Sequence, residues 1–530
     1  MNGEGGRFGD TVGAIGASKW IVAFTVMLPT LIEIIDISVA NVSLDHIRGS
    51  LSAGIDEAAW VLTSYLVSNA IIIPMTGWLA RTFGRKRYLT FSILLFTFAS
   101  LLCGSSTSLG MLVFFRVLQG IGGGALQPMS QSILLETFPP KEHGTAMAIF
   151  GIGAMFGPIA GPLMGGYITD TLSWRWIFYV NIPIGLLAVF MVKMFIHDPP
   201  YLAHRRGEKV DTWGIALLTV WVGALQIVVD KGQREDWFQS DFILVLSAVA
   251  VLALLLFVIV ELFVAENPVV DLRAFRNLSF TSGNVVMFVA FFNLLGSIVL
   301  LPLYAQLLLG YSATLAGLVL SPGGVATLVT MPIVGKLISK HDPKRVLVFG
   351  VLMCAFSTWT MSNFSLNADF DSLLWPRIYL GFGMGLLFIP LTTLTLSSIP
   401  KPQMGNATSI YNLLRNLGGS IGVAFSTTMF ARRAQVHQSR MTEHLTAMDE
   451  GLRAAVAKGQ ALLPSRGVPD AVAGNATLRR IYGQVVRQAT MMGFNDAFFI
   501  LSVLMACVLP LLLFLRRPAH QTAPSAGHDG

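Results

Sequence analysis

Charged residues, cysteines and nucleotide-binding motifs are all scarce in this chain. Only 12% of its 530 residues are charged, whereas 54% are hydrophobic, a composition that would not keep a soluble domain of this size in solution. No Gly-x-x-x-x-Gly-Lys-Ser/Thr loop occurs, so the sequence gives no sign of an ATP-driven pump. The three cysteines have neither paired nor metal-ligand spacing, so we expect buried free thiols at Cys103, Cys354 and Cys507. The composition indicates a polytopic membrane protein.

Signatures of enzymes and of nucleic-acid binding are also missing. The nine histidines lie mostly in loops and form no metal-binding cluster, and no nucleophile elbow is present. We therefore expect no catalytic residue, no metal site and no enzymatic activity. The net charge of +7 follows from basic loops that orient a membrane protein, so it requires no nucleic-acid partner. The first apolar run is too long for a signal peptide, and we expect it to remain as a membrane span.

Apolar runs of about 20 residues predict an all-α protein with about fourteen membrane spans. The runs lie near residues 20–43, 57–80, 88–108, 110–133, 145–168, 175–196, 212–230, 241–264, 279–303, 313–335, 345–364, 373–397, 405–430 and 493–515. Basic residues gather in alternate loops, which the positive-inside rule places in the cytoplasm. They are Arg81, Arg85, Lys86, Arg87, Lys141, Arg205, Arg206, Lys209, Arg273, Arg276, Lys336, Lys340, Lys344, Arg345, Lys401, Arg516 and Arg517. Both termini are therefore predicted to be cytoplasmic.

The two halves of the chain resemble each other. The run from Phe115 to Gly124 matches the run from Pro376 to Gly385, with an arginine and three glycines in register. The pair Gly77 and Lys86-Arg87 matches Gly335 and Lys344-Arg345 at nearly the same offset. Such repeats are typical of transporters built from two homologous bundles with a binding site between them. The residues that we assign to the second half as counterparts are Arg377, Gly381, Gly385 and Arg415.

This repeat predicts two six-helix bundles with two inserted helices between them. The predicted parts are a cytoplasmic tail 1–19, a bundle 20–196, a linker with the inserted helices 197–278, a bundle 279–515 and a tail 516–530. Residues 431–492 form a long polar segment that the span count places outside the cytoplasm. Apolar periodicity there predicts an amphipathic helix over 436–456, a break at 463–467 and a second helix around 478–485. Such a hairpin caps the exit side or binds a partner, and two solvated helices resting on the bundle are the alternative.

Two acids lie inside the first predicted span. Glu33 and Asp36 are three residues apart, so they share one face of a membrane helix. An acid in hydrocarbon must face a bundle interior or a wet cavity, and it is a candidate functional site, most simply a proton or cation carrier. The alternatives are an interfacial acid and a helix–helix hydrogen bond.

Arg116 lies inside the fourth predicted span, with Gly120 and Gly124 on the same stripe. A buried arginine needs an anionic partner, and Asp36 or Glu33 is the candidate. A site that opens and closes to water changes the balance between burial and charge pairing, which is a physical basis for coupling proton movement to conformation. The alternative is a structural arginine bonded to backbone carbonyls.

A glycine recurs at every fourth position of the fifth predicted span, with two prolines beside it. This pattern predicts close helix packing and a bend, and we assign these residues to a gate, with ordinary packing as the alternative: Gly153, Gly157, Pro158, Gly161, Pro162 and Gly165. Polar residues inside other spans are candidates to line a substrate cavity, although most such residues serve helix packing. They are Asn41, Asn69, Gln127, Asn293, Tyr304, Gln306 and Asn412.

Taken together, these motifs resemble the major facilitator superfamily and its fourteen-span drug–proton antiporter branch of EmrB-like exporters. The loop from Gly77 to Arg87 is similar to the superfamily signature between the second and third helices, through Gly77, Gly84, Arg85, Lys86 and Arg87. The Arg116 run is similar to the signature attributed to proton coupling, and the Gly157-Pro158 ladder to the antiporter motif. The segments 33–42, 173–178 and 181–185 resemble motifs of the branch. The superfamily loop carries an acid where this chain has Arg81, so no charge latch is assumed there.

The resemblance implies proton-coupled antiport of amphipathic drugs or toxic organic compounds by alternating access in the inner membrane. The proton gradient would be the energy source without any cofactor, and Asp36, Glu33 and Arg116 would carry the coupling. Relatives in double-membrane bacteria work with a periplasmic adaptor and an outer-membrane channel. Lys86 and Arg87 either hold acids or lipid phosphates or simply set the topology. Alternative functions are export of one metabolite, such as a fatty acid, siderophore or antibiotic, and a non-transporting ligand sensor; the direction of transport stays open.

Overall fold

The structure, a computed structural model, describes residues 18–199, 211–338, 340–443, 445, 449–462 and 469–516. All regular secondary structure in these residues is helical, which confirms the predicted all-α class. Twelve of the described helical segments are long and apolar enough to cross a membrane. Two further long helices, α7 and α16, pack beside them, so fourteen spans are compatible with the structure. Arg205, Arg206, Lys209 and Arg517 lie outside the described residues, as does most of the predicted tail 1–19.

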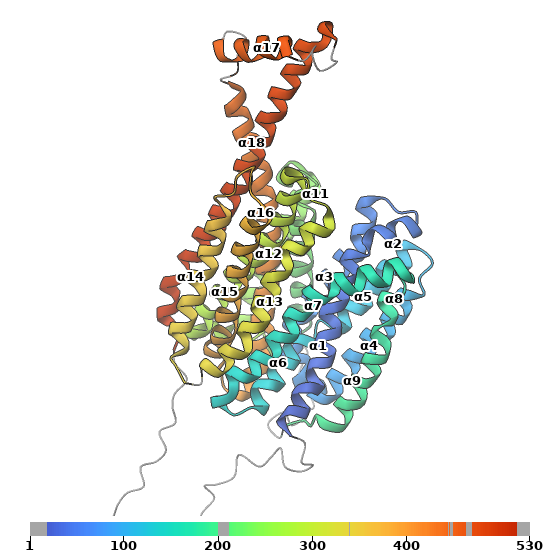
Figure 1. Cartoon of the computed structure of the whole chain (residues 1–530). Coiled ribbons are helices and arrows are strands. Elements are labelled where there is room, and N and C mark those ends of the chain that lie inside the picture. The colour runs from blue at the N-terminus through green and yellow to red at the C-terminus, as the bar shows by residue number, and fades with distance from the viewer. Residues whose placement is uncertain are drawn as a thin grey trace, which may run out of the picture.

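The first six predicted spans form the N-terminal half of the bundle, on the right of Figure 1. Its helices are α1 (Lys19–Val42), α2 (Leu44–Ser50), α3 (Ile55–Phe83), α4 (Arg85–Gly104), α5 (Leu109–Gly123), α6 (Leu126–Thr137), α7 (His143–Thr171), α8 (Trp176–Tyr179) and α9 (Asn181–Phe195), with a 3-10 turn η1 (Pro140–Glu142). The glycines of α5 bring three helices into backbone contact. A Cβ on Gly120 would lie 2.6 Å from the Tyr65 carbonyl oxygen of α3, and one on Gly122 would lie 2.6 Å from the Phe96 nitrogen of α4. The same glycine run ends α5, so the fourth predicted span is divided into α5 and α6.

The last six predicted spans form the C-terminal half, on the left of Figure 1. Its helices are α12 (Leu278–Leu309), α13 (Ala313–Leu337), α14 (Pro343–Met361), α15 (Phe370–Leu396), α16 (Met404–Glu443), α17 (Glu450–Leu462) and α18 (Asp470–Cys507), with short segments η5 (Leu272–Arg276), η6 (Lys401–Gln403) and η8 (Leu509–Phe514). Cys103 and Cys354 are buried as expected. Cys507 is exposed, so its predicted burial is wrong. It lies on the outer side of the end of α18, whereas Met505 and Val508 face the core.

Between the halves lies the inserted pair, α10 (Thr212–Lys231) and α11 (Asp241–Ile259), followed by a π-turn η4 (Val260–Val264) and accompanied by η3 (Trp237–Gln239). Helix α10 contacts both halves. Asp230 accepts a hydrogen bond from Thr63 of α3, and Gln226 donates to Ser420 of α16 over 3.1 Å. The inserted pair therefore packs across one seam of the bundle instead of standing apart from it.

A helical stalk extends from the bundle where the polar segment 431–492 was predicted to leave the membrane (Figure 1). It consists of the last turns of α16 and the first turns of α18, with α17 at its tip. At the base of the stalk, the rings of Phe430 and Phe494 stack with centroids 3.9 Å apart. The predicted helix over 436–456 is divided: its first residues continue α16, and α17 begins at Glu450 after Asp449 accepts from the Leu452 nitrogen. The predicted break at 463–467 lies outside the described residues.

The two halves touch mainly toward one end of the bundle. We call the end where α1 begins and η8 ends the terminal end, and the opposite one the stalk end (Figure 1). Gly77 of α3 donates its N–H to Ser409 of α16 over 3.1 Å, and the rings of Phe150 and Phe388 stack at 6.3 Å. Among the described residues, no hydrogen bond joins α1–α9 to α12–α18 on the stalk side of Arg415. The structure is therefore closed at the terminal end.

Candidate functional site: a buried polar network on α1

The site is built around Asp36, which α1 buries in the N-terminal half at 2% exposure. Its Oδ2 accepts a hydrogen bond from Arg116 Nη1 over 2.6 Å. Its Oδ1 accepts from Gln119 Nε2 over 2.9 Å and from Asn181 Nδ2 over 2.8 Å. These donors come from α5 and α9, so one carboxylate connects three helices. The predicted arginine–acid pair is thus present, and Asp36 is the acid.

Arg116 is held by an acid and by two further acceptors. It is 1% exposed, and besides Asp36 its Nη1 donates to Gln119 over 2.8 Å while its Nε donates to the Val61 carbonyl oxygen over 3.1 Å. The Tyr65 ring lies 4.3 Å from its Cζ. A buried charge needs this degree of pairing to be tolerated in a membrane interior. Both interpretations of Arg116, ion pair and backbone contact, hold for the same side chain.

Gln119, Asn181 and Ser100 belong to this site although the sequence analysis assigned them no role. Asn181 also donates to Ser100 over 3.0 Å, and Ser100 donates to the Phe178 carbonyl oxygen over 2.8 Å. Gln119 follows Arg116 by three residues on the same helix face, which is a signal that the sequence offers. Asn181 begins the segment 181–185 that resembles a motif of the branch, whereas nothing in the sequence distinguishes Ser100, which tertiary packing brings to the site through its hydrogen bond with Asn181.

Glu33 lies one turn away with a different environment. It is 1% exposed, and its Oε1 accepts from Asn69 over 3.1 Å and from Gln127 over 3.2 Å. Its Oε2 is buried and has no hydrogen-bond partner. An unsatisfied buried polar atom is expensive and points to function. The two acids of α1 are therefore unequal: every oxygen of Asp36 has a donor, and one of Glu33 has none.

The Glu33 side of the network crosses to the C-terminal half. Gln127 Oε1 accepts a hydrogen bond from Arg415 Nη2 of α16, and Asn412 one turn earlier donates to Gln131 over 2.7 Å. Arg415 was grouped with the repeat counterparts only by its place in the second half. In the structure, the Gln127 side chain bridges Glu33 and Arg415. A change in the charge of Glu33 can therefore alter the contacts between the two halves.

The predicted gating glycines pack against the opposite face of α1. A Cβ on Gly157 would meet the Ile34 side chain, one on Gly161 would meet Ser38, and one on Gly165 would lie 3.0 Å from Val39 Cγ1. Gly153 faces Met27 in the same way. Pro158 and Pro162 lie within α7, and their side chains are not among those described. The ladder thus lets α7 press onto the helix that carries both acids.

At the terminal end, the predicted loop motif joins α3 to α4. Gly84 has φ of 86°, a conformation that suits glycine. Arg85 forms a bidentate pair with Glu136 of α6, with bonds of 2.8 and 2.7 Å, and the Lys86 N–H donates to Asp198 over 2.8 Å. A Cβ on Gly77 would lie 2.7 Å from the Asn406 nitrogen. The motif therefore packs the first half against the start of α16. The two roles expected for Lys86 and Arg87, binding of acids or lipid phosphates and setting of the topology, stay predictions.

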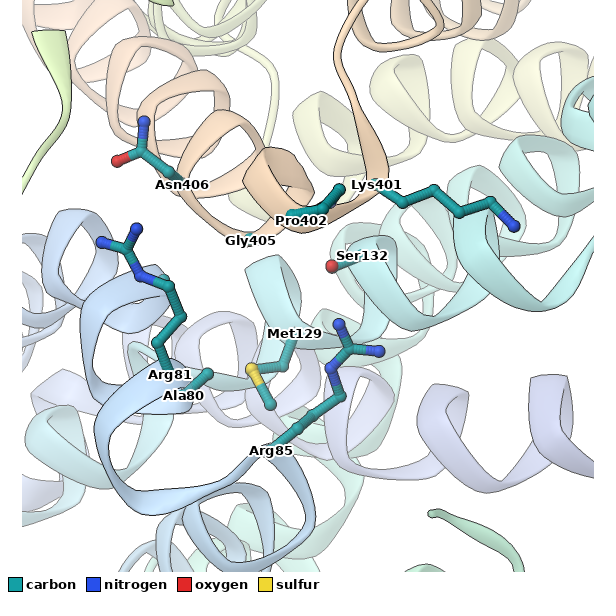
Figure 2. Close-up of a pocket in the computed structure, with 10 residues that line it drawn as sticks. Ala80, Arg81, Arg85, Met129, Ser132, Lys401, Pro402, Gly405 and Asn406 are labelled. Carbon is teal, nitrogen blue, oxygen red and sulfur yellow. The ribbon is translucent and has the colours of Figure 1, made fainter. Parts of the chain in front are cut away.

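Figure 2 shows the small pocket at this contact, where Arg81 and Ala80 of α3 lie opposite Gly405 and Asn406 of α16. The remaining labelled residues are Arg85, Met129, Ser132, Lys401 and Pro402. About 10 Å³ of it is open to water, roughly the room of one water molecule. The pocket is too small for organic cargo, so it is a packing seam of the closed end.

The seven polar residues predicted to line a cavity do not form one group. Asn69, Gln127 and Asn412 belong to the central network described above. Asn293 donates to the Leu501 carbonyl oxygen over 3.1 Å, and Tyr304 donates to the Ser365 carbonyl oxygen over 2.7 Å, so both bind within the C-terminal half. The remaining two are exposed on their helices, namely Asn41 and Gln306.

The two glycines among the repeat counterparts let α15 pack closely against α13. A Cβ on Gly381 would meet the backbone of Gly323, and one on Gly385 would lie 2.7 Å from Thr330 Cβ. Arg377 is 6% exposed, and its Nε and Nη1 have no hydrogen-bond partner. No group of three or more histidine, cysteine or acidic side chains within the described residues is placed to hold a metal ion.

Comparison with known proteins identifies the family. The profile described as "Major Facilitator Superfamily" matches residues 26–423. The chain is 36% identical to the "Multidrug export protein EmrB" of Escherichia coli (strain K12), over 95% of this chain and 96% of that one. It is 34% identical to the "Fatty acid resistance protein FarB" of Neisseria gonorrhoeae, over 95% and 97%.

A solved structure shares the same fold. The proton:xylose symporter XylE, solved with 6-bromo-6-deoxy-D-glucose bound, superposes with a TM-score of 0.61 at 14% identity, covering 93% of this chain and 95% of that one. The structural similarity extends over both six-helix halves. The sequence identity is too low to show this relationship by itself. The chain belongs to the major facilitator superfamily, among its EmrB-like multidrug exporters.

Proposed function

We propose that this protein exports amphipathic organic compounds from the cell in exchange for protons, by alternating access in the inner membrane. The observation that carries the proposal is the pair of buried carboxylates on α1, one ion-paired to Arg116 and the other joined to the C-terminal half through Gln127 and Arg415. Binding of cargo alone requires no titratable acid in hydrocarbon, whereas transport driven by protons does.

The two acids differ in what a proton displaces. A proton on Glu33 Oε2 breaks no hydrogen bond, because that oxygen has no partner. A proton on Asp36 removes the charge that holds Arg116 and competes with the donors of α5 and α9. Protonation of Asp36 therefore loosens α1 from its own bundle, which is the step that couples proton binding to helix movement.

The basic loops support an orientation for this cycle. Arg85, Lys86 and Lys344 lie at the starts of α4 and α14, at the terminal end, and the positive-inside rule puts such residues in the cytoplasm. In that orientation the described state is closed to the cytoplasm, and cargo and protons exchange on the stalk side. Rocking of the halves about the network would open the terminal end.

A proteoliposome assay tests the proposal. Purified protein is reconstituted with an imposed pH gradient, and lipophilic cations and anions are offered while internal pH is recorded. Cargo-dependent proton movement in the wild type, absent from empty liposomes, is the expected result. Cargo movement without any proton flux would favour a uniporter, and ligand binding without movement would favour a sensor.

The same proposal assigns the stalk to a partner. Exporters of this kind are expected to work with a periplasmic adaptor and an outer-membrane channel, and a groove of about 340 Å³ between α17 and α18 offers apolar contacts through Leu452, Val456 and Leu478. Photo-crosslinkers at these positions should capture an adaptor in cells. Crosslinks only within the chain would leave the stalk as a solvated hairpin.

A further inference from the structure

Arg377 is a buried cation for which the described part of the C-terminal half shows no counter-ion. It is 6% exposed, and its Nε and Nη1 are buried without an acceptor. The described helices α12, α13, α14 and α15 contain one acid, Asp371. That residue is exposed in the first turn of α15, six positions before Arg377 and on another face of the helix.

The side chain faces the interior of its half. Trp375 and Phe382, which are 54% and 36% exposed, lie on the opposite side of α15 by helical periodicity. A Cβ on Gly323 of α13 would lie 2.9 Å from Arg377 Cγ and 2.9 Å from its Nε. Arg377 thus lies across the backbone of α13 at a glycine that makes room for it. It is not directed to lipid, as a side chain that reaches for the membrane surface would be.

Comparison with Arg116 shows that three of its partners are replaced. Three residues after each arginine stand Gln119 and Leu380. Twelve residues before the matched Gly77 and Gly335 stand Tyr65, whose ring covers Arg116, and Gly323. Helix α12 offers no acid in place of Asp36. At these matched positions the described part of the second half therefore retains the arginine without the acid, the amide and the aromatic ring that surround Arg116.

We propose that Arg377 binds the carboxylate of an amphipathic cargo, which takes the place that Asp36 takes beside Arg116. This inference rests on the proposed export function and names a substrate class for it. An uncompensated guanidinium in an apolar interior is unfavourable until an anion arrives, and its fork of donors matches a carboxylate with two parallel hydrogen bonds.

Binding without any pH gradient tests the site separately from transport. The probes are 11-(dansylamino)undecanoic acid and its methyl ester, which differ in charge but share their chain, and dansyl fluorescence reports affinity for protein in neutral detergent. The wild type should bind the acid more tightly than the ester. Arg377→Gln should lower the affinity for the acid about tenfold or more and change the affinity for the ester by no more than about twofold. The affinity of Arg377→Lys for the acid should lie between those of the wild type and Arg377→Gln, because lysine retains the charge without the fork of donors.

Arg487→Gln is the matched control, because Arg487 lies in the same half but already donates to the Leu308 carbonyl oxygen over 2.6 Å. It should keep the wild-type ratio of acid to ester. Equal affinity of the wild type for both probes overturns the proposal without any variant, and so does an equal loss of both in Arg377→Gln. If Arg377→Gln does not fold, the wild-type ratio and Arg377→Lys decide.

An anionic lipid is the other source of a suitable group. The acid probe is therefore also measured in nanodiscs of phosphatidylcholine with and without phosphatidylglycerol. Loss of acid binding only with phosphatidylglycerol would assign Arg377 to a lipid headgroup and overturn the cargo assignment. A retained acid preference in a wild type that shows no proton flux would instead reject the proposed antiport and leave this site standing.

Discussion

The two halves of the bundle carry the same arginine in opposite surroundings. Arg116 has Asp36, Gln119 and a backbone carbonyl as acceptors, whereas two nitrogens of Arg377 have none. The glycines beside both arginines pack helices in the same way, Gly120 on α3 and Gly381 on α13. The repeat therefore determines how helices approach each other, and each half sets the chemistry of its arginine separately. One arginine is held in the buried polar network around Asp36, and the other is the proposed site for an anionic cargo.

Removal of the two arginines should give the largest difference between the halves. Arg116→Ala leaves Asp36 buried without its counter-ion and is expected to cost about 3–5 kcal/mol of stability and to abolish proton-driven transport. Arg377→Ala removes a charge that has no counter-ion among the described residues and should cost much less. Thermal unfolding of both purified variants measures this contrast.

A double variant checks the cause of the Arg116 effect. Arg116→Ala combined with Asp36→Asn removes both charges and should be more stable than Arg116→Ala alone. Equal destabilisation by the two alanine variants would show that the halves do not differ in charge compensation.

Asp36→Asn should separate transport from binding. The amide mimics a protonated acid, so uphill transport driven by a pH gradient should vanish while binding or exchange of cargo persists. Substrate-dependent proton flux in proteoliposomes is the measurement. Asp45→Asn is the control, because that carboxylate is 85% exposed on α2 and should transport normally. Wild-type flux from Asp36→Asn would remove Asp36 as the essential carrier.

The glycine ladder should be sensitive only where it touches α1. Gly157→Leu or Gly161→Leu would drive a side chain into Ile34 or Ser38, so we expect insertion to persist, stability to fall by about 1–3 kcal/mol and transport to stop. Gly166→Leu on the same helix meets nothing within 4 Å and should be tolerated. Normal transport by the first two variants would exclude α7 from the gate.

Glu33→Gln should have a smaller effect than Asp36→Asn, because Asp36 and its donors stay intact. Proton flux per cargo molecule is expected to fall without vanishing. The discriminating measurement compares the transport of a lipophilic cation with that of an anion of similar size. Unchanged proton flux with selective loss of the cation would assign Glu33 to cargo recognition.

Topology tags test the orientation of both halves without altering either arginine site. Reporters after Lys231 and within 440–480 should read outside the cytoplasm, and reporters near Arg273 and at both termini should read cytoplasmic. A cytoplasmic signal from 440–480 would reverse the orientation of both halves and the direction assigned to the closed state.

The sequence identified the acids and Arg116 because charge inside an apolar run is conspicuous, and it identified the glycine ladder because its period matches the helix. It did not decide which of the two acids pairs with Arg116, since both lie on one face of α1. It assigned no role to Asn181 or Ser100, because such residues are common in membrane helices and only their neighbours reveal a function. It predicted the thirteenth span and the helix beginning at 436 as separate elements, whereas α16 runs through both to Glu443.

By itself, the sequence determined the all-helical class, the two halves, the family and the cost of burying Glu33, Asp36 and Arg116, because hydropathy and repeat spacing depend only on residue order. Tertiary structure alone decided which charges meet. Hydrogen bonds act over about 3 Å, and the partners of these charges come from helices tens or hundreds of residues away. Packing therefore pairs both oxygens of Asp36, leaves one oxygen of Glu33 without a donor, brings Arg415 across the interface and leaves two nitrogens of Arg377 without an acceptor.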